Sequence, residues 1–228
     1  MNSAHLIRPL FLAFLFTVCA VSAEAGEGGG PLVAGLLFGG SENEHITSSA
    51  RMTNGDLVVC GWTESYDIPV SVPSFKATNS GGRDAFVAVL SLDLKTVKAF
   101  TFYGGAQDDL ATCVAVDPTG RIVVIGETES PDLAMATGSI SQVYSANIDG
   151  FIVVFNSNLT LLQRSSYLNG IGDEHPTAIA VDPNGGVYFC GYTNSRSGFP
   201  TNNGYDRSHN GSIDGFVCKV DASLSTMQ

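Results

Sequence analysis

Short apolar runs separated by turn-forming residues follow one another through the middle of the chain. Three runs are apolar at nearly every position, which is typical of strands buried on both faces of a sheet. The last run alternates and carries Gln163 and Arg164, as an edge strand would. The four runs are residues 111–117 (ATCVAVD), 121–128 (RIVVIGET), 149–156 (DGFIVVFN) and 160–168 (TLLQRSSYL). This pattern predicts a four-stranded antiparallel meander.

A tight turn joins the first two runs. Its sequence is DPTG, Asp117–Gly120. Asp and Pro favour the opening positions of such a turn, and a glycine supplies the position with positive φ. We therefore expect a hairpin here. A long loop, 129–148, follows the second run, and loops of this length are uncommon between the strands of a hairpin.

The same meander occurs three times at a constant spacing, without an insertion. Among the residues that recur in register are Gly55, Gly120 and Gly185; Gly61, Gly126 and Gly191; Thr63, Thr128 and Thr193; Ser65, Ser130 and Ser195; and Asp84, Asp149 and Asp214. The repeats are predicted to occupy residues 41–105, 106–170 and 171–228. Ahead of them, residues 31–38 (PLVAGLLF) resemble a fourth strand without the other three.

A sheet that is apolar on both faces must pack between copies of itself. Around an axis this arrangement is a β-propeller, so we expect an all-β chain of three four-stranded blades. Residues 31–38 are expected to complete the last blade. Propellers typically have 4–8 blades, so three form a partial ring. Either further blades follow in a longer chain, which we favour, or a homo-oligomer completes the ring.

The N-terminal residues 1–25 predict a secretory signal peptide. A basic start and an apolar run, 10–21, precede small residues that suit cleavage near Ala23 or Ala25. The run is too short to span a membrane. Residues 26–30 are a glycine-rich linker, and residues 31–228 form the repeat domain. We therefore expect a secreted or surface-displayed protein without membrane insertion.

Composition narrows the class of partner. The 228 residues are 44% hydrophobic and 14% charged, which predicts a folded chain, and the net charge of −11 argues against a nucleic-acid partner. Four cysteines of the mature chain lie in apolar runs, where they can be buried thiols or form one or two disulfides. They are Cys60, Cys113, Cys190 and Cys218.

The third repeat carries a family resemblance. Thr177–Pro200, TAIAVDPNGGVYFCGYTNSRSGFP, followed by DGFVCKV at Asp214–Val220, resembles the SBBP family of β-propeller repeats. The first copy departs most, because Arg51 and Met52 replace the Val and Asp of the AVD segment. The resemblance implies a secreted or surface-displayed propeller, and it implies no single reaction, since propellers serve many functions.

Asp84, Asp149 and Asp214 each begin the third strand of a repeat. Each is expected to face the threonine that ends the second strand (Thr63, Thr128 and Thr193). A carboxylate there can accept hydrogen bonds from backbone N–H groups or from the threonine hydroxyl and so hold the long loop. Because the residues recur in every repeat, we expect a structural role for them.

The connections from the fourth strand to the next first strand are acidic, and His45 and His175 follow the acids. Several carboxylates at one rim suit Ca²⁺, although a solvated acidic rim is the alternative and no cofactor is required. Leu110 stands at the equivalent position of the second repeat, so a histidine metal site is not expected. The candidate calcium ligands are Glu44, Asp108, Asp109, Asp173 and Glu174.

A candidate ligand rim lies where the long loops begin. Trp62 and Tyr192 directly precede these loops and can stack on a sugar ring or pack between blades. Glu64, Glu129 and Asn194 open the three loops.

Catalytic signatures such as GxSxG do not occur. We therefore expect a non-enzymatic scaffold that binds a protein or glycan. The alternatives are an oligomeric, lectin-like propeller, and a hydrolase or lyase that uses the acids of the rim.

Overall fold

The protein is described by a computed structural model, which describes residues 34–68, 73–145, 147–201 and 204–221. The chain divides into two compact units, residues 1–37 and 38–228. The proposed signal peptide, 1–25, and the linker, 26–30, lie outside the described residues. In the first unit, the described residues 34–37 form neither helix nor strand.

The described part of the second unit is all β, as predicted. It contains no helix, and therefore none long and apolar enough to cross a membrane. Its strands are β1 (Glu44–Arg51), β2 (Leu57–Thr63), β3 (Asp84–Leu90), β4 (Val97–Tyr103), β5 (Asp109–Val116), β6 (Ile122–Thr128), β7 (Asp149–Phe155), β8 (Leu162–Leu168), β9 (Glu174–Val181), β10 (Val187–Thr193) and β11 (Asp214–Val220).

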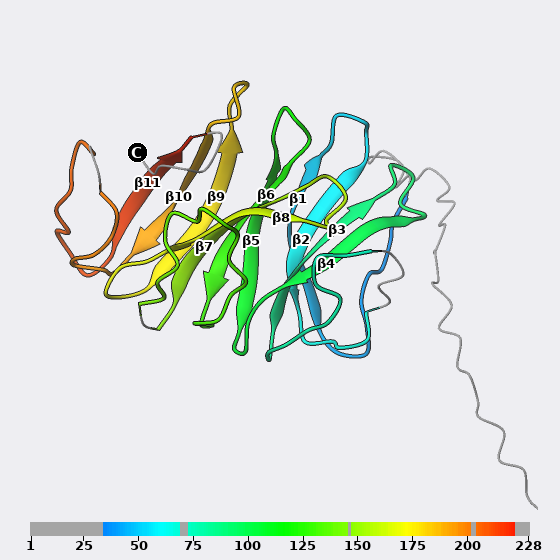
Figure 1. Cartoon of the computed structure of the whole chain (residues 1–228), viewed down its shortest axis with the longest axis horizontal. Coiled ribbons are helices and arrows are strands. Elements are labelled where there is room, and N and C mark those ends of the chain that lie inside the picture. Colours follow the sequence, from blue (N-terminus) through cyan, green and yellow to red (C-terminus); the bar gives the residue numbers. More distant parts are fainter. Residues whose placement is uncertain (1–33, 69–72, 146, 202–203, 222–228) are drawn as a thin grey trace, which may run out of the picture. The chain divides into compact units, whose positions relative to one another are not determined.

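These strands form three antiparallel meanders (Figure 1). The first sheet has the order β1-β2-β3-β4, the second β5-β6-β7-β8, and the third, within the described residues, β9-β10-β11. In the second sheet the more polar run forms the edge strand β8, which confirms the expectation from Gln163 and Arg164. Strand boundaries agree with the apolar runs to within about two residues, as strand ends generally do.

The backbone requires glycine at two positions of each repeat. The turn glycine Gly120 has φ +85°, and its counterparts Gly55 and Gly185 have +92° and +85°, which confirms the predicted turn. At Gly126 the pairing of β5 with β6 shifts by one residue in a β-bulge, and the Leu110 carbonyl oxygen comes close to this glycine. A side chain at position 126 would overlap that oxygen.

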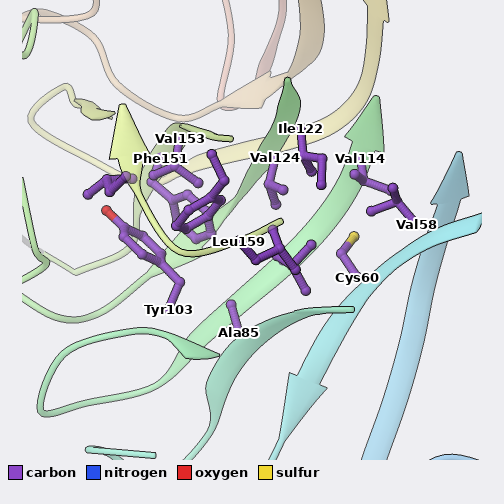
Figure 2. Packing of buried hydrophobic residues seen from close by; sticks show 14 of the residues in the cluster. Val58, Cys60, Ala85, Tyr103, Val114, Ile122, Val124, Phe151, Val153 and Leu159 are labelled. Carbon is purple, nitrogen blue, oxygen red and sulfur yellow. The ribbon is translucent and has the colours of Figure 1, made fainter. Parts of the chain in front are cut away.

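The second sheet is buried on both faces, as the apolar runs predict. Val124 and Val153 pack toward the first sheet in a cluster that also includes Tyr103 (Figure 2). Ile125 and Ile152 pack toward the third sheet in a second cluster. Successive residues of β6 therefore serve opposite interfaces, because side chains alternate along a strand.

Contacts between the sheets run through their first strands. β5 contacts β1, β2 and β3 of the first sheet, and β9 contacts β5, β6 and β7 of the second. The Thr47 hydroxyl donates to the Ala111 carbonyl oxygen at 2.7 Å, and the Thr112 hydroxyl donates to the Pro176 carbonyl oxygen at 2.8 Å. The same atoms therefore join both pairs of sheets, which is the packing of propeller blades around an axis.

The ring of sheets is not closed within the described residues. Of the N-terminal segment expected to complete the last blade, residues 31–33 lie outside the described residues, and residues 34–38 form no strand. The Phe38 ring lies 5.3 Å from that of Phe86 in the first sheet. Completion of the last blade by this segment therefore stays a prediction.

The four cysteines among the described residues, Cys60, Cys113, Cys190 and Cys218, are free thiols. Burial raises the pKa of Cys60 and of Cys218 to about 12, so both stay protonated at neutral pH. Of the two possibilities left open by the sequence, the structure has the thiols.

Candidate functional site

One face of the three sheets gathers the residues singled out in the sequence. We define this loop face as the connections from each fourth strand to the next first strand, 39–43, 104–108 and 169–173, with the long loops that begin at 64, 129 and 194. The two kinds of segment are hydrogen-bonded in each repeat. The backbone N–H groups of Glu64 and Glu129 donate to the carbonyl oxygens of Asn43 and Asp108, both at 2.9 Å.

A buried acid at the start of each first strand holds the loop face together. The Thr63 hydroxyl donates to Glu44 Oε1 at 2.7 Å, and the Thr193 hydroxyl donates to Glu174 Oε1 at 2.9 Å. The Thr128 hydroxyl donates to Asp109 in the same way. The recurring threonines therefore bond to the acids of the first strands and not to Asp84, Asp149 and Asp214, which pair with them in the backbone register.

Asp109 shows the arrangement most fully. Its carboxylate is completely buried and accepts hydrogen bonds from Thr128, from the Ser130 hydroxyl at 2.8 Å and from the Gly105 N–H at 2.7 Å. Desolvation by burial nevertheless raises the pKa of Asp109 to about 6, since these donors only partly offset it. Asp109 is thus a structural tie between strand, loop and the preceding sheet.

The aspartates that begin the third strands hold the ends of the long loops. Asp84 is fully buried and accepts from Lys76 Nζ at 2.8 Å and from the N–H groups of Ser80 and Gly81, each at 3.1 Å. Asp149 and Asp214 each accept one loop N–H, from Ser145 and Asn210, at 2.8 Å. The predicted bonds to backbone N–H groups are therefore present.

Asp149 differs from Asp84 because, among the described residues, it has no cationic partner like Lys76. Its Oδ1 atom is buried without a hydrogen-bond partner. Burial, with Glu174 and Asp173 nearby, raises the pKa of Asp149 to about 7.

The candidate calcium ligands have other partners. Asp108 accepts from Arg83 Nε at 2.8 Å, and Asp173 accepts from the Asn194 side chain at 2.8 Å. Glu44, Asp109 and Glu174 belong to three separate threonine networks. In the described ranges no group of three or more acidic, histidine or cysteine side chains is arranged to hold a metal ion. Calcium binding stays a prediction that this arrangement does not favour.

Aromatic and charged side chains gather where the second strands end. The rings of His45 and Trp62 stack with centroids 5.8 Å apart, and those of His175 and Tyr192 with centroids 4.6 Å apart. His175 Nδ1 also lies 2.9 Å from Glu127 Oε1 of the preceding sheet. Each predicted aromatic residue thus stacks on the histidine paired with it across the two strands.

Arg83 and Glu127 are functional candidates that the sequence did not reveal. The Arg83 guanidinium lies 5.5 Å from the Trp62 ring centroid while it pairs with Asp108. Glu127 occupies the position of Trp62 and Tyr192 in the second repeat. Arg83 has no counterpart in the other repeats, so the repeat pattern gives no signal for it. Glu127 can be recognised in the sequence because aromatic residues, Trp62 and Tyr192, occupy its position in the other two repeats.

The loop face also exposes large apolar side chains. Tyr192 is 41% exposed although it stacks on His175. The opposite face exposes fewer, among them Leu92 and Leu161. The large exposed side chains of the loop face are Tyr66, Val143, Ile171, Tyr192, Tyr205 and Ile213. Tyrosine and other large apolar residues on one surface are typical of binding sites.

One segment of the chain matches a known protein family. Residues 163–200, which include most of β8 and all of β9 and β10, match the SBBP beta-propeller repeat. The resemblance is confirmed. No curated protein matches the chain. The SBBP match and the stacked sheets together show a propeller scaffold built from repeats.

Proposed function

We propose that this propeller is a secreted or surface-displayed scaffold that binds a protein or glycan ligand through its loop face. The observation that carries the proposal is the pair of ring stacks on this face, Trp62 on His45 and Tyr192 on His175, with Tyr192 41% exposed. Such rings supply contact area at a low cost in conformational entropy. The N-terminal signal sequence supports export.

Binding suits this face better than a reaction does. Asp109 and Glu174, the acids that an acid–base mechanism would need, are buried and hold threonine and serine hydroxyls. With Glu44 they form one set of equivalent residues, each of which makes the same structural tie in its own repeat. An active site instead combines residues in different roles. A hydrolase or lyase therefore remains the weaker proposal.

The lectin-like alternative rests on the repeated stacking of Trp62 on His45 and of Tyr192 on His175. Equivalent aromatic platforms in successive blades can hold equivalent sugars. Glu127 interrupts the series in the second repeat, so a single composite ligand face is the simpler proposal.

The test is a binding screen with the mature chain against a glycan array and a random peptide library. We expect a ligand whose Kd rises tenfold or more in Trp62→Ala and in Tyr192→Ala, because each substitution removes a ring from the loop face. Leu161→Ala, on the opposite face, is the matched control and should leave the Kd unchanged. Ligands with the same Kd for all four proteins, or none from either library, would contradict the proposal.

A further inference from the structure

The third sheet has an open side, which we call the trailing face and define by Thr177, Tyr188 and Val217. Phe216 and Cys218 point from β11 into the cluster shared with the second sheet. Val217 lies between them and so points to the other side, where it is 80% exposed. A valine is thus displayed on the flat side of a sheet.

The other sheets show what covers this position. The residues equivalent to Val217 are Val87 and Ile152, and each is 1% exposed. Val87 is buried in the cluster between the first and second sheets, and Ile152 in the cluster between the second and third. In both cases the cover is the next sheet of the propeller.

Hydrogen bonding of the first strands identifies the matching surface. The hydroxyls of Thr47 and Thr112 donate to carbonyl oxygens of the following first strand, those of Ala111 and Pro176. The equivalent Thr177 is exposed, and its hydroxyl bonds within its own sheet to the Cys190 carbonyl oxygen at 3.4 Å. The residue that corresponds to Ala111 and Pro176 in the first repeat is Ile46.

The leading face, defined by Ile46 on β1, is open as well. Ile46 is exposed, whereas its counterparts Ala111 and Pro176 are buried against the preceding sheet. The two open surfaces are therefore the two halves of an interface that the chain already forms twice.

The edge of the third sheet has a place for the N-terminal segment. A groove of about 530 Å³ runs beside β11, lined by Phe199 and Phe216 among others. In the second sheet the edge strand β8 covers β7, with Tyr167 fully buried. By the repeat spacing Leu37 corresponds to Tyr167, yet it is 87% exposed.

Phe38, the residue after Leu37, packs on the first sheet in the way that the last residue of a fourth strand packs on the sheet that follows it. The rings of Phe38 and Phe86 lie 5.3 Å apart, and so do those of their counterparts Tyr103 and Phe151. Phe38 therefore packs on the first sheet as the end of β4 packs on the second.

The sequence alone favours further blades in a longer chain, but because the two open faces match each other, we propose that a second copy of this chain docks its leading face on the trailing face and adds its N-terminal segment beside β11. The Thr177 hydroxyl then donates to the Ile46 carbonyl oxygen of the second copy, and Leu37 of that copy fills the groove. The contact is head to tail, and it generates a ring when the rotation between the copies closes. Two copies of the three described sheets give six blades, within the usual range of 4–8, whereas three copies would exceed it.

The experiment measures the mass of the mature chain by sedimentation and light scattering. We expect twice the monomer mass. Val217→Asp and, separately, Leu37→Asp should each weaken association tenfold or more, because each places a carboxylate in a dry contact. Val143→Asp, at another exposed valine in the long loop of the second sheet, is the control and should remain a dimer.

Mixing the two variants tests the head-to-tail arrangement. A mixed dimer of Val217→Asp and Leu37→Asp has one interface with both substitutions and one with neither, so the mixture should regain dimer. Circular dichroism should show an unchanged β spectrum for both variants, since each altered side chain is exposed. A monomeric wild-type chain, or a mixture that stays monomeric, would overturn the proposal.

Discussion

Two carboxylates hold each repeat together, and each of them has different hydrogen-bond partners. Glu44, Asp109 and Glu174 bind the threonines that end the second strands, while Asp84, Asp149 and Asp214 hold the long loops. The sequence predicts Asp84, Asp149 and Asp214 as a recurring structural set, whereas it suggests Glu44, Asp109 and Glu174 only as candidate calcium ligands. It does not predict which acid the threonine binds, because that depends on the direction of each hydroxyl.

Asp149 should make the stability of the protein pH-dependent. Its pKa is about 7 in the folded protein, against an ordinary value of 3.8, so the folded chain binds a proton more tightly than the unfolded chain. Its contribution to the free energy of unfolding is therefore greatest at low pH and is lost as pH rises toward 7. We expect a fall of about 2 kcal/mol from this group between pH 5 and 7.

Urea denaturation over this pH range measures the effect. Asp149→Asn should reduce the slope, although the shift at Asp109, which has the same sign, will leave part of it. Asp93→Asn serves as the control, because Asp93 is exposed and its pKa is lowered by hydrogen bonds from Ser91 and Lys95. Equal slopes in wild type and Asp149→Asn would rule out this role for Asp149.

At the scale of the strands, one irregularity recurs in every first strand. The pairing shifts at Thr47 and Thr112, and it does so again in the third sheet next to Gly191. The bulge directs the threonine hydroxyls of the first two sheets toward the next sheet. The apolar runs predict the strands and their ends, but a bulge leaves no gap in the sequence.

The glycine opposite the bulge is the sequence feature that marks it. Replacing this glycine tests whether the close approach at the bulge requires it. Gly126→Ala should lower the free energy of unfolding by about 3 kcal/mol, because the new methyl group overlaps the Leu110 carbonyl oxygen and the Phe151 ring. Gly120→Ala has free space around it but a positive φ, so it should cost about 1 kcal/mol. Denaturation curves that rank the two variants in the opposite order would disprove this account.

At the scale of the whole molecule, two-sided burial was the informative property of the sequence. It predicts that the sheets stack, and the second sheet does contribute to clusters on both sides. Closure of the ring could not be predicted in the same way, because it depends on surfaces that are open in the described part of the chain.

Hydrogen exchange should report this difference between sheets. In the Val217→Asp chain, whose trailing face we expect to stay open, amides of β6 and β7 should exchange most slowly and those of β11 faster. Buried strands open only with the core around them, whereas β11 is an edge strand in the described part of the third sheet. Uniform protection across β7 and β11, measured by mass spectrometry, would contradict it.

The threonine contacts between first strands also bear on how such a protein can be lengthened. Because Thr47 and Thr112 meet their acceptors through the same atoms, a duplicated segment 106–170 inserted after Gly170 would offer its neighbours the junctions they already use. Gene duplication in whole units is then tolerated, whereas an insertion of any other length within a junction would misalign it.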